Sequence, residues 1–415
     1  MSSVIRHAKA TKPILIPYNG DLDAGDVNRV QNLSGGTTQP FTMLYEHGRE
    51  DKMAVDKDIL NTTAKMTQLE YGEMDTYLLL ANLASTPVNG LTLDDFSDAK
   101  VDMYITGKDD YNGVLEQTMW LPKLTVNSLT INIADANARI ERSFDFSGDK
   151  FRMEREGNKY LIYKKNVVDS GYSEDPYAIV LNDPAPVVNP NHAGQYLARV
   201  WRIRSGVTTE LNVTTDYTWT NGTTTLSVLS ATTGDIIKVI YTAASYGTAG
   251  DPTSLNDVDD YYLKASYITV SLQSGAGSEI ELDKLTSLNI AATLNRIDEG
   301  VLGNDEKILK EVQSKTTVVR LDGRVKDSTL EEVLMGQAGN NWGEIDADLF
   351  ASDITLRVKI YEDATKTSFK IGYKVTDMFF TDTTEDANAN EFWKDAVTLQ
   401  SDNLTISGLE ANIDA

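Results

Sequence analysis

The chain has 415 residues, of which 41% are hydrophobic and 24% charged, an ordinary globular composition with length for two or three domains. Its 62 acidic and 38 basic side chains give a formal net charge of −24. This charge repels phosphate and argues against tight nucleic-acid binding, although an acidic surface also serves solubility alone. The lack of cysteine excludes disulfides, thiolate metal sites and cysteine nucleophiles.

Residues 1–150 predict a first β unit. A helix is expected from Asp75 through Leu83, and strands are expected at 124–133 and 142–146. The beginning of the chain shows no apolar signal-peptide core, and the apolar stretch 77–84 is far shorter than the ~20 residues that a membrane-spanning helix needs.

Residues 151–262 differ in texture and predict an inserted small β module, of immunoglobulin-like or hairpin type, with linkers. A proline cluster lies at 184–190 and an acidic linker at 251–260. The dipeptide Asn221-Gly222 is typical of a tight hairpin. Short strands rich in Thr, Val and aromatics are expected at 196–204, 217–219, 223–228 and 236–241.

Residues 263–415 predict a second β unit with one helix beginning after Ser328. Apolar residues alternate with polar ones along its strands, so one sheet face is buried. The edge strands of such an antiparallel sheet can pair with a neighbouring chain. The expected strands are 266–272, 285–294, 316–325, 354–361, 369–379 and 396–406.

The second unit repeats features of the first in the same order, about 250 residues farther on. Individually the matches are weak, but their collinearity indicates an internal duplication. The matched segments are 30–33 with 288–290, 56–60 with 305–309, 65–71 with 315–321, 135–138 with 386–389, and 143–148 with 403–408. The fold class is therefore mainly β: two tandem β-sandwich or barrel units, each with a flanking helix, and an inserted small β domain.

No catalytic, cofactor-binding or metal-binding residues are predicted, and no cofactor is expected. The three histidines, His7, His47 and His192, are widely separated in the sequence. The acidic clusters 21–26 and 257–260 lack the spacing of a calcium loop.

One local group of basic residues favours a contact with another subunit. Lys150 lies among Arg139, Arg142, Arg152 and Arg155. Because the chain as a whole is acidic, ion pairing with an acidic neighbouring subunit is a better interpretation than DNA binding.

The motifs of the second unit resemble the major tail tube proteins of tailed bacteriophages. The resemblance rests on 285–290, the strand 318–323, the helix from Ser328 and the terminal 404–408. It covers 263–415, and it reaches 20–150 through the duplication. The resemblance implies a fold similar to the inner tube of type VI secretion systems.

The same resemblance implies a structural role without enzymatic activity. Copies would form rings, as trimers that imitate hexamers, stacked helically into a tube through which DNA passes without specific binding. The tape measure, baseplate and terminator proteins would be further partners, with no membrane partner. The expected location is the virion tail, assembled in the host cytoplasm.

Ring formation further favours segments that become ordered on assembly. Residues 1–19, the stretch 35–38 and the long connection 298–315 are the candidates.

Other classes of protein remain open. A capsid decoration or baseplate ring protein would share the β content. A surface adhesin would carry an export signal and calcium loops, and a polysaccharide-degrading tail enzyme would show a β-helix repeat of about 20 to 30 residues.

Overall fold

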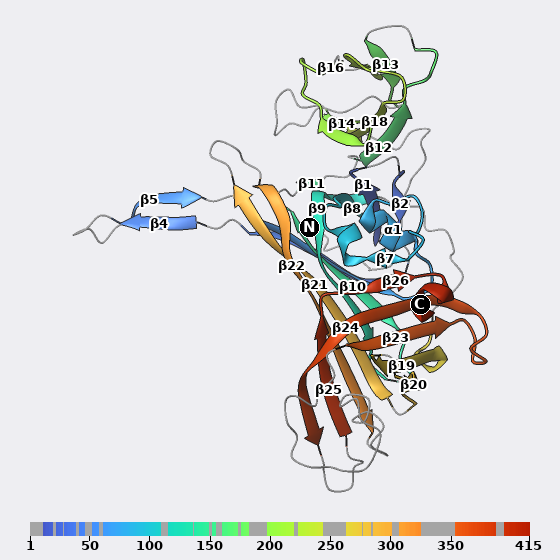
Figure 1. Cartoon of the computed structure of the whole chain (residues 1–415). Coiled ribbons are helices and arrows are strands. Elements are labelled where there is room, and N and C mark those ends of the chain that lie inside the picture. The colour runs from blue at the N-terminus through green and yellow to red at the C-terminus, as the bar shows by residue number, and fades with distance from the viewer. Residues whose placement is uncertain are drawn as a thin grey trace.

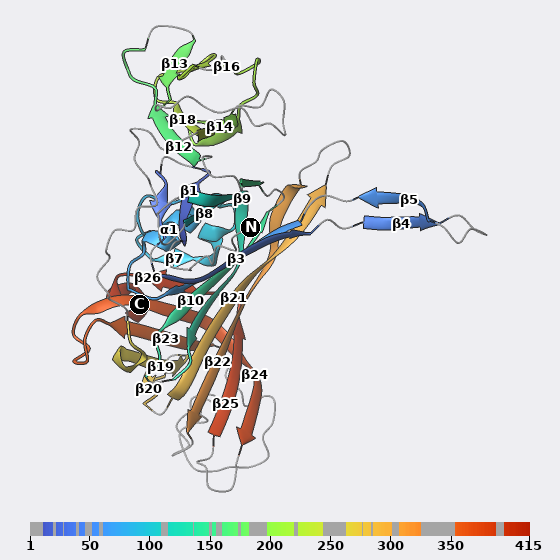
Figure 2. The same ribbon diagram turned by 180° about the vertical axis from the view of Figure 1, so that it is seen from behind.

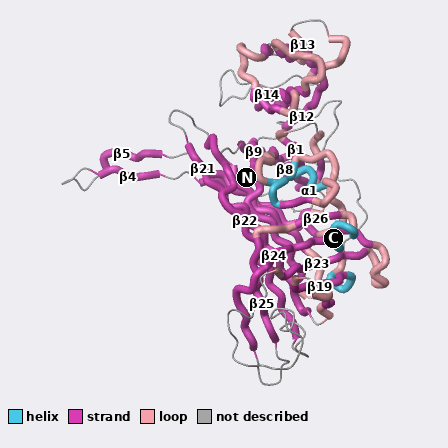
Figure 3. Tube along the Cα trace, viewed as in Figure 1, coloured by secondary structure: helices cyan, strands magenta, loops and turns pink. Residues whose placement is uncertain are grey.

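The computed structural model describes residues 11–19, 22–27, 29–38, 41–45, 52–57, 61–108, 115–135, 137–148, 152–154, 160–172, 176–181, 197–219, 223–243, 263–275, 277–283, 285–300, 307–324, 353–386 and 394–415. Strands dominate these segments (Figure 3). The predicted fold class, mainly β with two tandem β units and an inserted β domain, is confirmed.

In its described residues, the first repeat is an antiparallel β unit with two short helical segments and a projecting hairpin. Its helical segments are α1 (Asp75–Ala81) and the 3-10 turn Leu93–Phe96, and its hairpin is β4 (Phe41–Tyr45) with β5 (Lys52–Lys57). The remaining strands are β1 (Thr11–Pro17), β2 (Gly25–Asp26), β3 (Val30–Thr38), β6 (Asn61–Leu69), β7 (Leu91–Thr92), β8 (Val101–Lys108), β9 (Leu115–Ile133), β10 (Glu141–Gly148) and β11 (Arg152–Glu154).

The second repeat contains the same kinds of strands and ends in a short helix, α3 (Glu410–Asp414). A 3-10 turn, Ala265–Tyr267, precedes its first strand. Its strands are β19 (Ile268–Ser274), β20 (Ile280–Glu281), β21 (Leu285–Gly300), β22 (Lys307–Arg324), β23 (Ile354–Tyr361), β24 (Phe369–Asp386), β25 (Lys394–Ser401) and β26 (Thr405–Ser407).

The two repeats pair their strands in the same way. In the first, β1 pairs with β2 and β8, and pairing continues through β9, β10 and β6 to β3. In the second, β19 pairs with β20 and β23, and pairing continues through β24, β25 and β22 to β21. The short β11 and β26 pair with the first halves of β9 and β24.

Irregularities in the strand pairing recur at equivalent places, which fixes the correspondence residue by residue. Between β9 and β10 the register shifts after Val126, and between β24 and β25 it shifts after Phe380. The bends of the two long strands carry Lys123 and Asp377, both with positive φ, of 52° and 54°. A non-glycine residue rarely adopts a positive φ, so its occurrence at equivalent places indicates that the two repeats have the same backbone fold.

This correspondence corrects two of the sequence matches. Met66 pairs with Phe144, and Leu321 pairs with Val397, the equivalent of Phe144, so Met66 corresponds to Leu321. The offset between β6 and β22 is therefore five residues larger than in the match of 65–71 with 315–321. The match of 143–148 with 403–408 is also wrong, since β10 corresponds to β25. Residues 405–407 form β26, the counterpart of β11.

The repeats join edge to edge in one sheet (Figures 1 and 2). Its strand order is β3-β6-β10-β9-β21-β22-β25-β24. One apolar core runs through both repeats and includes Leu15, Met103, Phe144, Ile290 and Tyr373. Burial of alternate residues along these strands is what holds them in register.

The described residues of the inserted domain form two small sheets around a core of their own. The sheets are β12 (Tyr160–Val167), β18 (Ile236–Ala243), β14 (Leu197–Arg204) and β15 (Val207–Glu210), and β13 (Tyr177–Val180), β17 (Thr225–Val228) and β16 (Tyr217–Trp219). The expected hairpin pairing of β16 with β17 is present. Residues 221–222 and the linker 251–260 lie outside the described segments.

The inserted domain docks on the first repeat beside β1 (Figure 1), where a buried hydrophobic cluster joins Ile14 and Tyr104 to Trp201. Buried polar contacts add to this cluster. Arg199 Nη2 donates to Asp102 Oδ1 at 2.7 Å, and both side chains are buried. Lys238 Nζ donates to the Pro17 carbonyl at 2.8 Å, and the Trp201 indole donates to the Tyr18 carbonyl at 3.0 Å. An unpaired charge is costly in such a place, so these pairs favour one fixed orientation.

Some sequence expectations fail or lie beyond the described residues. Residues 11–17 form β1 and bury Ile14, Leu15 and Ile16, so this stretch is core and not an arm. Residues 35–38 belong to β3, and the described parts of 298–315 belong to β21 and β22. The helix expected after Ser328 lies outside the described segments. The boundaries 1–150, 151–262 and 263–415 stay a prediction.

Candidate assembly interface

The junction between the repeats is an antiparallel pairing of β9 with β21. It runs from Ile133 opposite Leu288 to Ser128 opposite Thr293. The side chains on its inner face, such as Ile131 and Ile290, are buried. The junction therefore combines a backbone ladder with apolar burial, the two features that stabilise sheet extension.

Arg296 forms hydrogen bonds across this junction at one end. From β21 its guanidinium donates to the Ser97 carbonyl at 2.6 Å, to the Phe96 carbonyl at 3.0 Å and to the Val126 carbonyl at 3.1 Å. All three acceptors belong to the first repeat. Charge-assisted hydrogen bonds of this kind are stronger than neutral ones, so Arg296 holds the second repeat against the first.

A buried polar cluster also spans the two repeats. Arg142 on β10 donates to Glu70 at 3.3 Å and to Gln68 at 2.9 Å. The Tyr373 hydroxyl on β24 donates to Glu70 at 2.6 Å and lies 2.9 Å from the Tyr77 hydroxyl. Because both side chains of the Arg142–Glu70 ion pair are fully buried, loss of either one would leave the other without its partner in the core.

Burial shapes the acid-base behaviour of the tyrosines in this cluster. It raises the pKa of Tyr71 to about 12 and raises the pKa values of Tyr77 and Tyr373 further. Nearby Glu70 also raises the pKa values of Tyr77 and Tyr373, since a negative charge disfavours a phenolate. These phenols therefore stay protonated and keep donating hydrogen bonds.

The combined sheet ends in two open edges. Among the described strands, β3 pairs only with β6, and the last part of β24, 379–386, pairs only with β25. By the correspondence of the repeats, β3 is equivalent to β21, and β24 is equivalent to β9. The two open edges are therefore the counterparts of the two strands that meet at the internal junction.

Exposure differs between the internal junction and its open counterpart. Thr125 and Val126 of β9 are 1% and 3% exposed, whereas the equivalent Phe379 of β24 is 46% exposed and Phe380 only partly buried. On β3, a Cβ added to Gly36 would meet nothing within 4 Å. Exposed apolar side chains next to an unpaired edge are typical of a surface that another chain covers.

One member of the predicted basic group is not available to a neighbouring subunit. Arg142 is fully buried in an ion pair within the chain, so it offers no charge to a neighbouring subunit. Arg139 forms a backbone bridge with Lys264, and Arg152 lies on β11. Lys150 and Arg155 lie outside the described residues.

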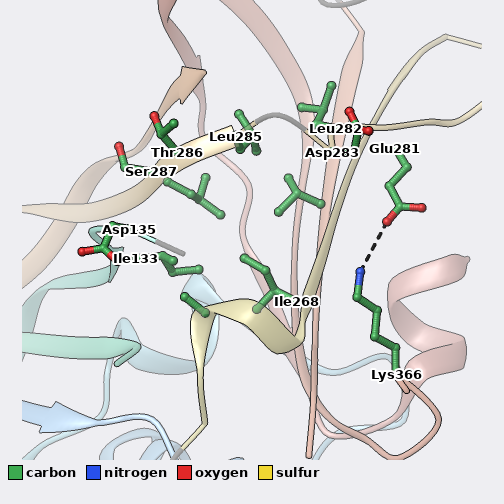
Figure 4. A pocket seen from close by; sticks show the side chains of 13 residues that line it. Ile133, Asp135, Ile268, Glu281, Leu282, Asp283, Leu285, Thr286, Ser287 and Lys366 are labelled. Atoms are coloured by element: carbon green, nitrogen blue, oxygen red, sulfur yellow. Dashed lines mark ion pairs between the residues drawn. The ribbon is translucent and has the colours of Figure 1, made fainter. Parts of the chain in front are cut away.

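A hollow of about 200 Å³ lies where the ends of β9 and β21 approach β19 and β20. Its walls are mostly apolar, including Ile133, Ile268 and Leu285, and a Lys366–Glu281 ion pair of 3.6 Å lies at one side (Figure 4). Asp135 and Asp283 also line it, but no nucleophile and base meet there. The arrangement offers no evident chemistry.

Other expected features give no site. His7, His47 and His192 and the acidic group 257–260 lie outside the described residues. Within the described segments, no group of three or more His, Cys, Asp or Glu side chains is placed to hold a metal ion. None of the described helices has the length and apolarity to cross a membrane.

Neither a family model nor a curated protein sequence matches the chain. Among solved structures, it is similar to a chain of the anti-feeding prophage baseplate, at 13% identity and a TM-score of 0.29, over 37% of this chain and 97% of that one. It is also similar to a chain of the anti-feeding prophage tube-terminating cap, at 15% identity and a TM-score of 0.26, over 39% and 100%.

Proposed function

We propose that this chain is a structural protein of a bacteriophage tail, whose copies join edge to edge into rings around a hollow axis. The observation that carries the proposal is the pair of open edges, β3 and β24, whose counterparts β21 and β9 are already joined inside the chain. A chain that presents both halves of a junction it uses internally can repeat that junction with further copies.

We further propose that the rings are trimers with six similar units, stacked as the tail tube through which DNA leaves the virion. The net charge of −24 supports this role, because an acidic channel repels phosphate within about 10 Å at ~0.1 M salt and does not grip DNA. The role is structural and not enzymatic. Such a protein would assemble in the host cytoplasm with other tail proteins.

Electron microscopy of the purified protein tests this proposal. We expect class-averaged top views of hollow rings, with a mass of three chains by native mass spectrometry, and side views of stacked rings. Rings that never stack would favour the baseplate ring alternative. Monomers at every protein concentration and salt condition would reject the assembly itself.

A further inference from the structure

The internal junction also specifies how two copies would meet. We propose that β24 of one copy pairs antiparallel with β3 of the next in the register of the β9–β21 junction, placing Thr384 opposite Gly36. This inference rests on the proposed function, and it adds the residue register of the contact between copies.

The register follows from the matched irregularities of the two repeats. The shift after Val126 and the shift after Phe380 make Thr130 and Thr384 equivalent. A shift near Gln31 in β3 and one near Thr286 in β21 make Gly36 and Ala291 equivalent. Inside the chain Thr130 lies opposite Ala291, so Thr384 is expected opposite Gly36.

Neighbouring positions follow in the same way. Glu385 is placed opposite Gly35, as Ile131 lies opposite Ile290 inside the chain. Thr383 is placed opposite Thr37, the counterpart of Leu129 with Ala292, and Asp382 opposite Thr38, the counterpart of Ser128 with Thr293. The face of β3 agrees with this placement. A Cβ added to Gly35 would lie 3.5 Å from Leu121, on the core side, as Ile290 does in the second repeat.

Charge favours this pairing over pairing between like edges. The end of β24 carries Asp382, Glu385 and Asp386, whereas β3, with the sequence VQNLSGGTT, carries no charged residue. Two β24 edges brought together would place carboxylates against each other, and like charges across a strand pair are destabilising. Pairing β24 with the uncharged β3 avoids this repulsion. Each copy therefore pairs its β24 edge with the β3 edge of the next copy, and all copies in a ring point the same way around it.

Engineered cysteines test the register directly, because the chain has none of its own. The variant Gly36→Cys/Thr384→Cys is expected to form disulfides between copies under mild oxidation. The pair Thr130→Cys/Ala291→Cys is the matched control, since it is the equivalent pair within one chain and must form an intramolecular disulfide. Directly opposite residues have Cα atoms about 4.5–5.5 Å apart, which a disulfide spans.

The off-register variant is Gly36→Cys/Asp386→Cys. Its cysteines would lie diagonally, about 7–8 Å apart, so we expect at least about a tenfold lower yield of covalent multimers on non-reducing gels. Equal or greater yield from this variant, or rings in which Gly36→Cys/Thr384→Cys stays unlinked, would overturn the register while leaving ring assembly intact. Absence of both rings and cross-links would overturn the proposed function as well.

A charge variant gives an independent readout. Gly36 faces open space, so Gly36→Glu and the uncharged, equally sized Gly36→Gln are both expected to fold. In the proposed register the glutamate lies beside the acidic end of β24, so only Gly36→Glu should lose rings, and salt should restore them. Equal assembly of the two variants at low salt would contradict the proposed contact.

Discussion

The two repeats share one plan of strand pairing but hold their interiors together differently. In the first, the buried Arg142, Glu70 and Tyr77 form the polar centre of the cluster that Tyr373 of the second repeat joins. In the second, the place of Arg142 is taken by Asp395, and the helix α3 closes the unit, with Arg357 donating to the Ile413 carbonyl at 3.0 Å. The backbone ladder and its bulges therefore define the unit, while its interior contacts can change.

Removal of Arg142 gives the largest expected effect and tests whether the polar centre stabilises the first repeat. Arg142→Met leaves the Glu70 carboxyl group in the core without its cationic partner, so we expect the free energy of unfolding to fall by about 3–5 kcal/mol in urea titrations. Arg320→Ala in the second repeat is the control. Its pair with Asp322 is exposed, and its loss should cost about 0–1 kcal/mol.

A double variant sharpens this result. Glu70→Gln added to Arg142→Met replaces the unpartnered buried carboxyl group by a neutral amide and should recover part of the lost stability. If Arg142→Met and Arg320→Ala have equal effects, the buried pair does not stabilise the first repeat in the way we infer.

Removal of Arg296 is expected to have the next largest effect, because it loosens the junction between the repeats. Arg296→Ala deletes charge-assisted hydrogen bonds to three carbonyls and should lower the free energy of unfolding by about 1.5–3 kcal/mol. Hydrogen exchange should become faster in β9 and β21 first.

The matched control for Arg296 is Lys315→Ala, which also removes a cation that links the repeats. Lys315 pairs with Asp94, whose side chain is 72% exposed, so its loss should cost less than about 1 kcal/mol. Unchanged exchange of β9 and β21 in Arg296→Ala would show that the ladder alone holds the junction.

The sequence predicts the strands of this fold better than their partners. Alternation locates β23 at its observed bounds, and the order of weak matches indicates the duplication. The sequence match of β6 with β22 is wrong by five residues, because identities such as Lys65 with Lys315 involve residues outside the core. Only the pairing of Phe144 with Met66, and of Val397 with Leu321, fixes it.

The candidate interface is harder to predict, for physical reasons. Arg142, Phe144 and Phe146 lie two residues apart along β10, so strand periodicity places Arg142 on the buried face. Because arginine is charged, sequence reasoning assigns it to the surface instead. Arg296 gives no local signal at all. Its acceptors at Phe96, Ser97 and Val126 lie far away in the sequence and are backbone carbonyls, which carry no residue identity.

The smallest expected effect is a change in pH dependence, which tests the polar centre without breaking it. An unfolded tyrosine has a pKa near 10, while burial raises the pKa of Tyr71 to about 12. The folded chain thus keeps a proton that the unfolded chain loses. The associated stability is complete below about pH 10 and falls as the pH rises toward about 12, by up to about 1.4 kcal/mol per pH unit for each such group.

Tyr71→Phe removes one of these groups, so the loss of stability between about pH 10 and 12 should become shallower. At neutral pH the variant should lose about 1 kcal/mol, because the hydroxyl no longer donates to Asp75. Ile371→Val is the control, since it removes one core methylene, costs about 0.5–1.5 kcal/mol and titrates nothing. Its stability should be lower by the same amount at every pH. An unchanged slope in Tyr71→Phe would mean that Tyr71 is more accessible to water in the folded chain than its buried position indicates.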